Sequence, residues 1–169
     1  YVALAAWRRH PQRIRALVLC DTRAGADSDA AREKRTALIA TAESEGAGAV
    51  AAQQLPGQLG KSTRTDAPAL VDEVERMLRR APVHAITGAL RAMMARPDST
   101  DTLATITVPT LIICGEEDVL RPVKESEAMH AAIADAQLAL IPGAGHASCV
   151  EHPSAFNALL SGFVQARFP

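Results

Sequence analysis

The sequence predicts an α/β fold, a partial doubly wound parallel sheet of about three strands with an inserted block of α-helices. Three short apolar runs, at residues 15–21, 110–114 and 137–141, have the length and composition of strands, and the first has the pattern of a strand buried on both faces. Helical segments separate the second run from the third and follow the third. This alternation is typical of a parallel sheet with right-handed crossovers.

The segment before the first strand favours a helix. Residues 1–9 are mostly small and apolar, and Pro11 ends the helical pattern. The chain starts without an initiator Met and without the charged start of a signal peptide, as if the helix were already under way. We therefore expect that the sequence is the later part of a longer chain.

The region between the first and second strands has a different character. It is rich in Ala and charged residues, and apolar side chains recur at helical spacing at Leu70, Val71, Val74 and Leu78. We expect about four helices here, with residues 55–65 forming a loop because Pro and Gly are frequent in them. The predicted division is a core of residues 1–23 and 98–169 and a helical insertion of residues 24–97.

The remaining elements complete the predicted core. A short helix at residues 101–106 leads to the second strand, and Pro122 begins a helix that leads to the third. The last helix runs from about Pro153 to Ala166 and carries Phe156 and Phe163 on one face.

The composition excludes several classes of protein. The chain has 169 residues, of which 48% are hydrophobic, enough for one substantial core. The 18 basic and 19 acidic side chains are dispersed, giving a net charge of −1, so we expect no nucleic-acid partner. The apolar runs stop well short of the roughly 20 residues of a membrane span, so we expect no membrane partner either.

The three cysteines, Cys20, Cys114 and Cys149, are odd in number and lack C-x-x-C spacing, which argues against a disulfide or zinc framework. Cys20 and Cys114 lie in predicted strands and fit buried thiols. A reducing, cytoplasmic location is the prediction.

Two polar side chains follow neighbouring strands. Asp118 comes after the second strand in Gly115-Glu-Glu-Asp118, and His146 after the third in Gly143-Ala-Gly-His146. Because chemistry gathers at the carboxyl ends of parallel strands, the two residues are expected to meet there. An Asp that accepts a hydrogen bond from one imidazole nitrogen fixes the tautomer and leaves the other nitrogen as a general base.

Three alternatives compete with this dyad. Asp21, at the end of the first strand, is another candidate acid, although a turn or capping role fits it better. Cys149 is three residues from His146 and would give a Cys-His pair, but two groups in one loop rarely align for attack. A metal cluster of His146, Cys149, Glu151 and His152 lacks the usual ligand spacing.

Two segments resemble a known family. VPTLIICGEEDVLRP at residues 108–122 and IPGAGHASCVEHP at residues 141–153 are similar to the acid and histidine segments of the α/β-hydrolase superfamily. PQRIRALVLCD at residues 11–21 resembles the stretch that follows the nucleophile helix in that family. By this resemblance Asp118 is the catalytic acid, His146 is the catalytic base, and the helical insertion is the variable cap.

One part of the family pattern is missing. The nucleophile elbow, G-x-S-x-G, does not occur in the sequence. Similar sequences would place it immediately before Tyr1, together with an oxyanion loop farther upstream. The chain is therefore expected to carry two of the three triad members.

The resemblance implies hydrolysis of a small ester or lactone through a Ser-Asp-His triad, with no cofactor and no metal. A cofactor-free haloperoxidase or an enol-lactonase relative is an alternative within the superfamily. The alternative from another class is a catalytically incomplete fragment that acts only with a partner chain supplying the N-terminal half. A small ester-like substrate is the expected partner, and a homo-oligomer stays open.

Overall fold

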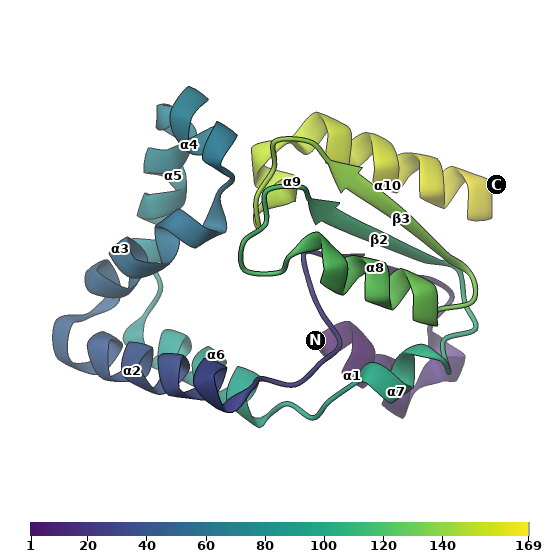
Figure 1. Cartoon of the computed structure of the whole chain (residues 1–169), viewed down its shortest axis with the longest axis horizontal. Coiled ribbons are helices and arrows are strands. Elements are labelled where there is room, and N and C mark those ends of the chain that lie inside the picture. The colour runs from purple at the N-terminus through teal and green to yellow at the C-terminus, as the bar shows by residue number, and fades with distance from the viewer. Residues whose placement is uncertain (169) are drawn as a thin grey trace.

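Three parallel strands form one sheet in the order β1-β2-β3 in the computed structural model, which describes residues 1–168 (Figure 1). The strands are β1 (Leu17–Cys20), β2 (Thr110–Gly115) and β3 (Ala136–Ile141). The helices are α1 (Val2–Arg9), the 3-10 turn η1 (Pro11–Arg13), α2 (Asp29–Glu45), α3 (Ala47–Gln58), α4 (Lys61–Asp66), α5 (Pro68–Arg79), α6 (Val83–Ala95), α7 (Thr100–Leu103), α8 (Val123–Ala132), α9 (Ser148–Glu151) and α10 (Pro153–Arg167). The predicted α/β class, the three parallel strands and the inserted helices are confirmed.

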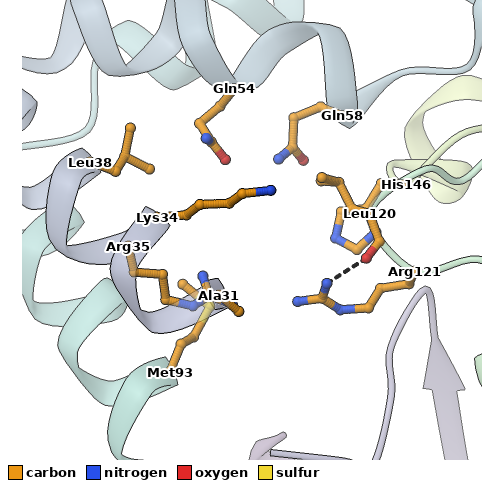
Figure 2. A pocket seen from close by; sticks show the side chains of 10 residues that line it. All are labelled: Ala31, Lys34, Arg35, Leu38, Gln54, Gln58, Met93, Leu120, Arg121 and His146. Atoms are coloured by element: carbon orange, nitrogen blue, oxygen red, sulfur yellow. Dashed lines mark hydrogen bonds between the residues drawn. The ribbon is translucent and has the colours of Figure 1, made fainter. Parts of the chain in front are cut away.

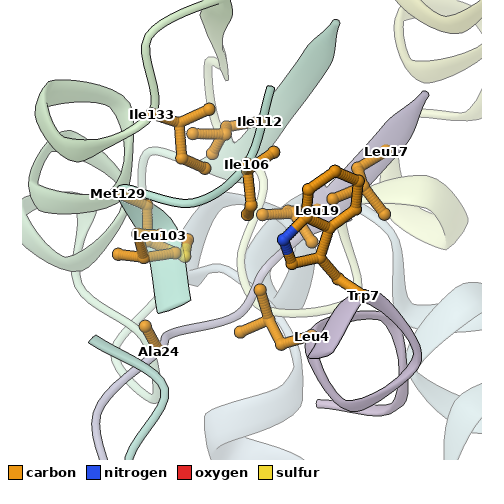
Figure 3. Close-up of a cluster of buried hydrophobic side chains, with 10 residues drawn as sticks. All are labelled: Leu4, Trp7, Leu17, Leu19, Ala24, Leu103, Ile106, Ile112, Met129 and Ile133. Carbon is orange, nitrogen blue, oxygen red and sulfur yellow. The ribbon is translucent and has the colours of Figure 1, made fainter. Parts of the chain in front are cut away.

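The central strand β2 is buried along its whole length, as its apolar run predicts. Its side chains alternate between two cores. Ile112 packs with α1, α7 and α8 on one face of the sheet, where Leu4, Trp7 and Met129 are buried (Figure 3). The indole N–H of Trp7 donates to the hydroxyl of Thr105 at 3.0 Å, so this buried N–H has a hydrogen-bond partner.

The other face of β2 packs against the last helix. Leu111 and Ile113 contact Ile141 of β3 and Phe163 of α10. The sheet therefore has helices on both faces, the arrangement that defines a doubly wound fold.

Helices α2 to α6 form a separate group beside the sheet (Figure 1). Helix α2 packs on α6 and α3 packs on α5, around a small core that includes Leu38, Ala42, Val50 and Leu90. The predicted division into a core and an insertion stays a prediction, as does the role of this helical group as a cap.

The prediction of a loop at residues 55–65 is wrong. Helix α3 continues through Pro56, and α4 covers most of the rest, so only Leu59 and Gly60 lie between the two helices. Pro56 removes one backbone N–H near the end of α3, and burial of Val50 and Ala51 stabilises the helix against that loss. The insertion therefore has five helices in place of the expected four.

The carboxyl ends of β2 and β3 point toward the side on which α2 to α6 lie (Figure 1). Loops that follow the strands consequently meet the helical group. Within residues 1–168, none of the helices combines the length and the apolar character that crossing a membrane requires.

Candidate active site

Asp118 and His146 meet at the carboxyl edge of the sheet, as the topology predicts. Oδ2 of Asp118 lies 2.8 Å from Nδ1 of His146. The Asp118 side chain is fully buried, whereas 24% of the His146 side chain is exposed. This arrangement leaves Nε2 of His146 unengaged, because no other residue among 1–168 forms a hydrogen bond with the ring.

The second carboxylate oxygen of Asp118 is held by its own loop. Oδ1 accepts the backbone N–H groups of Leu120 and Arg121, each at 2.8 Å. With both oxygens engaged, the carboxylate is oriented before any substrate arrives, which keeps the imidazole in one tautomer.

The loops that carry the two residues are bonded to each other. The N–H of Glu116 donates to the carbonyl of Ile141 at 3.1 Å, and the N–H of Glu117 donates to the carbonyl of Ala144 at 2.8 Å. The distance between Asp118 and His146 is therefore set by backbone contacts as well as by their side chains.

A second acid, Glu151, connects the histidine loop to the helical group. Its side chain accepts the N–H of Gly145 at 2.8 Å and the N–H of Gly60 at 2.7 Å. Gly145 directly precedes His146, and Gly60 lies between α3 and α4. The carboxylate of Glu151 therefore positions the histidine loop and the helical group relative to each other.

Glu117 makes a parallel connection. Its carboxylate accepts the backbone N–H of Ser62 at 2.8 Å and the Ser62 hydroxyl at 2.6 Å. These bonds lower the pKa of Glu117. The acid loop and the first turn of α4 are joined in this way.

Asp21 has partners of its own. Its carboxylate accepts the N–H of Gly115 at 3.0 Å and the hydroxyl of Ser148 at 2.6 Å. Burial raises the pKa of Asp21, although the bond from Ser148 opposes that effect. Its backbone has a φ of +44°, a left-handed conformation suited to a sharp turn. The geometry of Asp21 therefore fits a role in shaping the turn. The carboxylate that contacts His146 is that of Asp118.

Three possible ligand groups lie close together: single atoms of Asp21, Cys114 and Asp118 are within 4.8 Å of one another. Both oxygens of each carboxylate already accept hydrogen bonds. Burial raises the pKa of Cys114 to about 11, so its sulfur stays a thiol rather than a thiolate ligand. The group therefore fits a hydrogen-bonded network better than a metal site.

The alternatives based on Cys149 gain no support from the geometry. Cys149 is exposed on α9. Both oxygens of Glu151, which the metal cluster would need, accept backbone N–H groups.

A cavity of about 260 Å³ opens beside His146, between the sheet edge and the helical group (Figure 2). It is lined by Ala31, Lys34, Arg35 and Leu38 of α2, Gln54 and Gln58 of α3, Met93 of α6, Leu120, Arg121 and His146. A more apolar cavity of about 190 Å³ lies within the helical group and shares Leu38, Gln54, Gln58 and Met93 with it.

Sequence reasoning missed most of these residues. Lys34, Arg35 and Leu38 share one face of α2 at helical spacing, but the pattern does not reveal what that face contacts. Arg121 stands next to the acid motif, three residues after Asp118. This proximity in sequence could have indicated that Arg121 lies at the site, because Arg121 and Asp118 are on the same loop.

The parallel sheet with helices on both faces, together with the Asp-His pair at its carboxyl edge, defines the α/β-hydrolase class of protein. A family model described as "Serine aminopeptidase, S33" matches residues 1–153. The chain belongs to this family and is an α/β-hydrolase.

The chain is similar to several characterised proteins. Its structure matches a thermophilic esterase from Thermogutta terrifontis, solved with malate bound, with a TM-score of 0.96 and 34% identity. The match covers 100% of this chain and 62% of the esterase. The enol-lactonase from Burkholderia xenovorans shares the fold with a TM-score of 0.86 over 96% of this chain and 61% of its own, at 24% identity.

A match in sequence covers a shorter region. RutD of Escherichia coli, to which a carbamate hydrolase activity is ascribed, is 38% identical over 90 residues, which are 52% of this chain and 34% of RutD. The chain thus spans about a third of the length of that relative.

Proposed function

We propose that the protein hydrolyses a small ester or lactone through a Ser-Asp-His triad, in which Asp118 is the acid and His146 the base. The observation that carries the proposal is the 2.8 Å contact between Nδ1 of His146 and Oδ2 of Asp118, at the edge of a cavity that His146 lines. The similarity to the Thermogutta esterase supports an ester as the substrate class.

In the proposed mechanism, Nε2 of His146 takes the proton of a serine hydroxyl as its oxygen attacks the acyl carbon. The Asp118 carboxylate stabilises the imidazolium that forms. The imidazolium then gives the proton to the departing alcohol, leaving an acyl-enzyme. His146 next activates a water molecule, which releases the acid and restores the serine.

We further propose that the serine and the oxyanion donors come from outside residues 1–169. The sequence has no G-x-S-x-G, and no serine among residues 1–168 is bonded to His146. Residues 24–97 would then act as the cap over the cavity, since α2, α3 and α6 supply most of its lining. Residues 1–169 alone would be the catalytically incomplete fragment.

The test measures hydrolysis of p-nitrophenyl acetate by the protein as its gene encodes it, with its intact mass recorded. Asp118→Asn is expected to lower kcat about 10⁴-fold, because the imidazole loses its orienting acceptor, and His146→Ala is expected to lower it at least as much. Residues 1–169 produced alone are expected to be inactive. Unchanged turnover in His146→Ala would refute the triad assignment.

A further inference from the structure

The cavity beside His146 is lined by cations and by no carboxylate. Lys34, Arg35 and Arg121 contribute three positive side chains, and the other seven lining residues include neither Asp nor Glu. Lys34 extends from α2 into the cavity, and Arg121 approaches from the opposite side (Figure 2). Neither Lys34 nor Arg121 is ion-paired within residues 1–168.

A cluster of three arginines lies beside the cavity, and one of them, Arg35, lines it. Arg23, Arg35 and Arg96 share the buried carboxylate of Asp27, and Arg23 also lies 4.0 Å from the carboxylate of Glu125. The Nε atoms of Arg23 and Arg96 are buried without a hydrogen-bond partner in the described chain. The three arginine side chains are largely buried, so water screens their field on the cavity only weakly.

Arg121 is held in position without using all its donors. Its Nη2 and Nε donate to the Tyr1 hydroxyl at 2.7 and 3.1 Å, and Nη1 donates to the carbonyl of Leu120. A guanidinium has five N–H donors in a planar fork, so two stay available. The backbone N–H of Arg121 is bonded to Asp118, which places this fork on the loop that orients the catalytic acid.

We propose that the substrate is a carboxylate-bearing ester, such as a half-ester of a small dicarboxylic acid, whose free carboxylate binds between Lys34 and Arg121. This inference rests on the proposed function, because it places the ester carbonyl at His146. A carboxylate accepts the two remaining N–H groups of Arg121 on its two oxygens and the Lys34 ammonium as a charge-assisted donor. The cavity volume of about 260 Å³ suits a small acid of this kind.

The reaction balances without a further reactant. The ester C–O bond breaks, the alcohol leaves with a proton from His146, and the oxygen of water bonds to the acyl carbon. The products are the alcohol and a dicarboxylate.

The test compares two substrates of nearly equal shape, ethyl hydrogen succinate and ethyl succinamate, which carry a carboxylate and a neutral amide. With the protein as encoded, kcat/KM is measured by pH-stat titration at neutral pH. The charged ester is expected to be favoured by about tenfold or more, because hydrogen bonds to charged groups are the stronger ones. Lys34→Gln and Arg121→Gln are each expected to lower the preference several-fold, mainly through KM.

Arg32→Gln is the matched control. Arg32 is exposed on the same helix but faces away from the cavity, in a surface groove lined by Asp29, Arg32 and Thr36. The Arg32→Gln variant is expected to keep the wild-type preference for the charged ester. Raised salt should reduce the preference of the wild type, since screening weakens exposed charge pairs.

Ethyl butyrate separates failure of this inference from failure of the proposed function. If His146-dependent hydrolysis of ethyl butyrate is found but the two succinate esters react equally, the hydrolase proposal stands and the anion site is overturned. If no ester is hydrolysed, calorimetric titration of the His146→Ala variant with both succinate esters decides. Tighter binding of the charged ester, weakened by Lys34→Gln, supports the anion site, and equal binding overturns it.

Discussion

Gly115, the last residue of β2, lies so close to Gly145 that a Cβ atom at residue 115 would overlap the carbonyl oxygen of Gly145. The acid loop and the histidine loop therefore cross with their backbones in direct contact. Only a residue without a side chain permits this approach. The contact fixes the separation of the two strands' loops, and with it the place where Asp118 can meet His146.

Gly115→Ala tests this contact. A methyl group there meets backbone atoms, which cannot move aside as a flexible side chain would. The loops are expected to separate, lowering kcat/KM about 100-fold and stability by about 1–3 kcal/mol. Ester hydrolysis and urea unfolding measure the two effects.

Gly162→Ala is the control for this substitution. A Cβ atom at Gly162, in α10, meets nothing within 4 Å, so activity should be unchanged. Stability should rise by about 0.4–1 kcal/mol, because Ala restricts the unfolded chain. Full activity in Gly115→Ala would mean that the loop contact does not position the dyad.

The pattern of apolar runs was sufficient to predict the three strands, although only β2 is buried along its whole length and β3 is partly exposed. The meeting of Asp118 and His146 followed from topology alone, since parallel strands bring their carboxyl ends to one edge. The end of α3 was less predictable, because Pro56 and Gly57 suggest a loop until tertiary burial is known.

The charged cavity could not be predicted either. Arg35, Arg96 and Asp27 come together through folding, although up to 69 residues separate them. Lys34 reads as an ordinary exposed lysine on a charged helix. Lys34 lines the cavity because α2 lies opposite the acid loop, and local periodicity does not predict that placement.

Glu151→Gln tests the connection between the histidine loop and the helical group. The amide of Gln would turn a donor toward the N–H of Gly145 or of Gly60, where only an acceptor fits. We expect a loss of about 1–3 kcal/mol in stability and a fall in kcat of about tenfold or more, with a smaller change in KM. Urea unfolding and steady-state kinetics measure both.

Glu116→Gln is the matched control for Glu151→Gln, because Glu116 is exposed in the neighbouring loop. Its stability and kcat should equal those of the wild type. If the Glu151 variant loses stability but keeps its kcat, the carboxylate joins the loops without positioning His146.

Asp27→Asn tests the buried arginine cluster. The substitution removes the buried carboxylate that pairs with Arg35 and Arg96, and it leaves Arg23 only the carboxylate of Glu125, 4.0 Å away. Breaking a buried ion pair in this way is expected to cost about 3–5 kcal/mol of unfolding free energy. Asp135→Asn is the control, since Asp135 pairs with Arg167 at the surface and should contribute less than about 1 kcal/mol.

Stability is also expected to fall in acid for the same reason. Burial alone would raise the pKa of Asp27, but the hydrogen bonds and charges of its arginines, Arg35 foremost, outweigh burial and lower the pKa to about 2. Because the pKa is lower in the folded state than the unfolded value of about 3.9, the contribution is fully present above that value and is lost as the pH falls toward 2. We expect about 2–3 kcal/mol of unfolding free energy to disappear over this range. Urea unfolding of the wild type and of Asp27→Asn between pH 5 and pH 2 measures the difference, which should narrow as the pH falls. A constant difference would show that the Asp27 charge does not stabilise the fold.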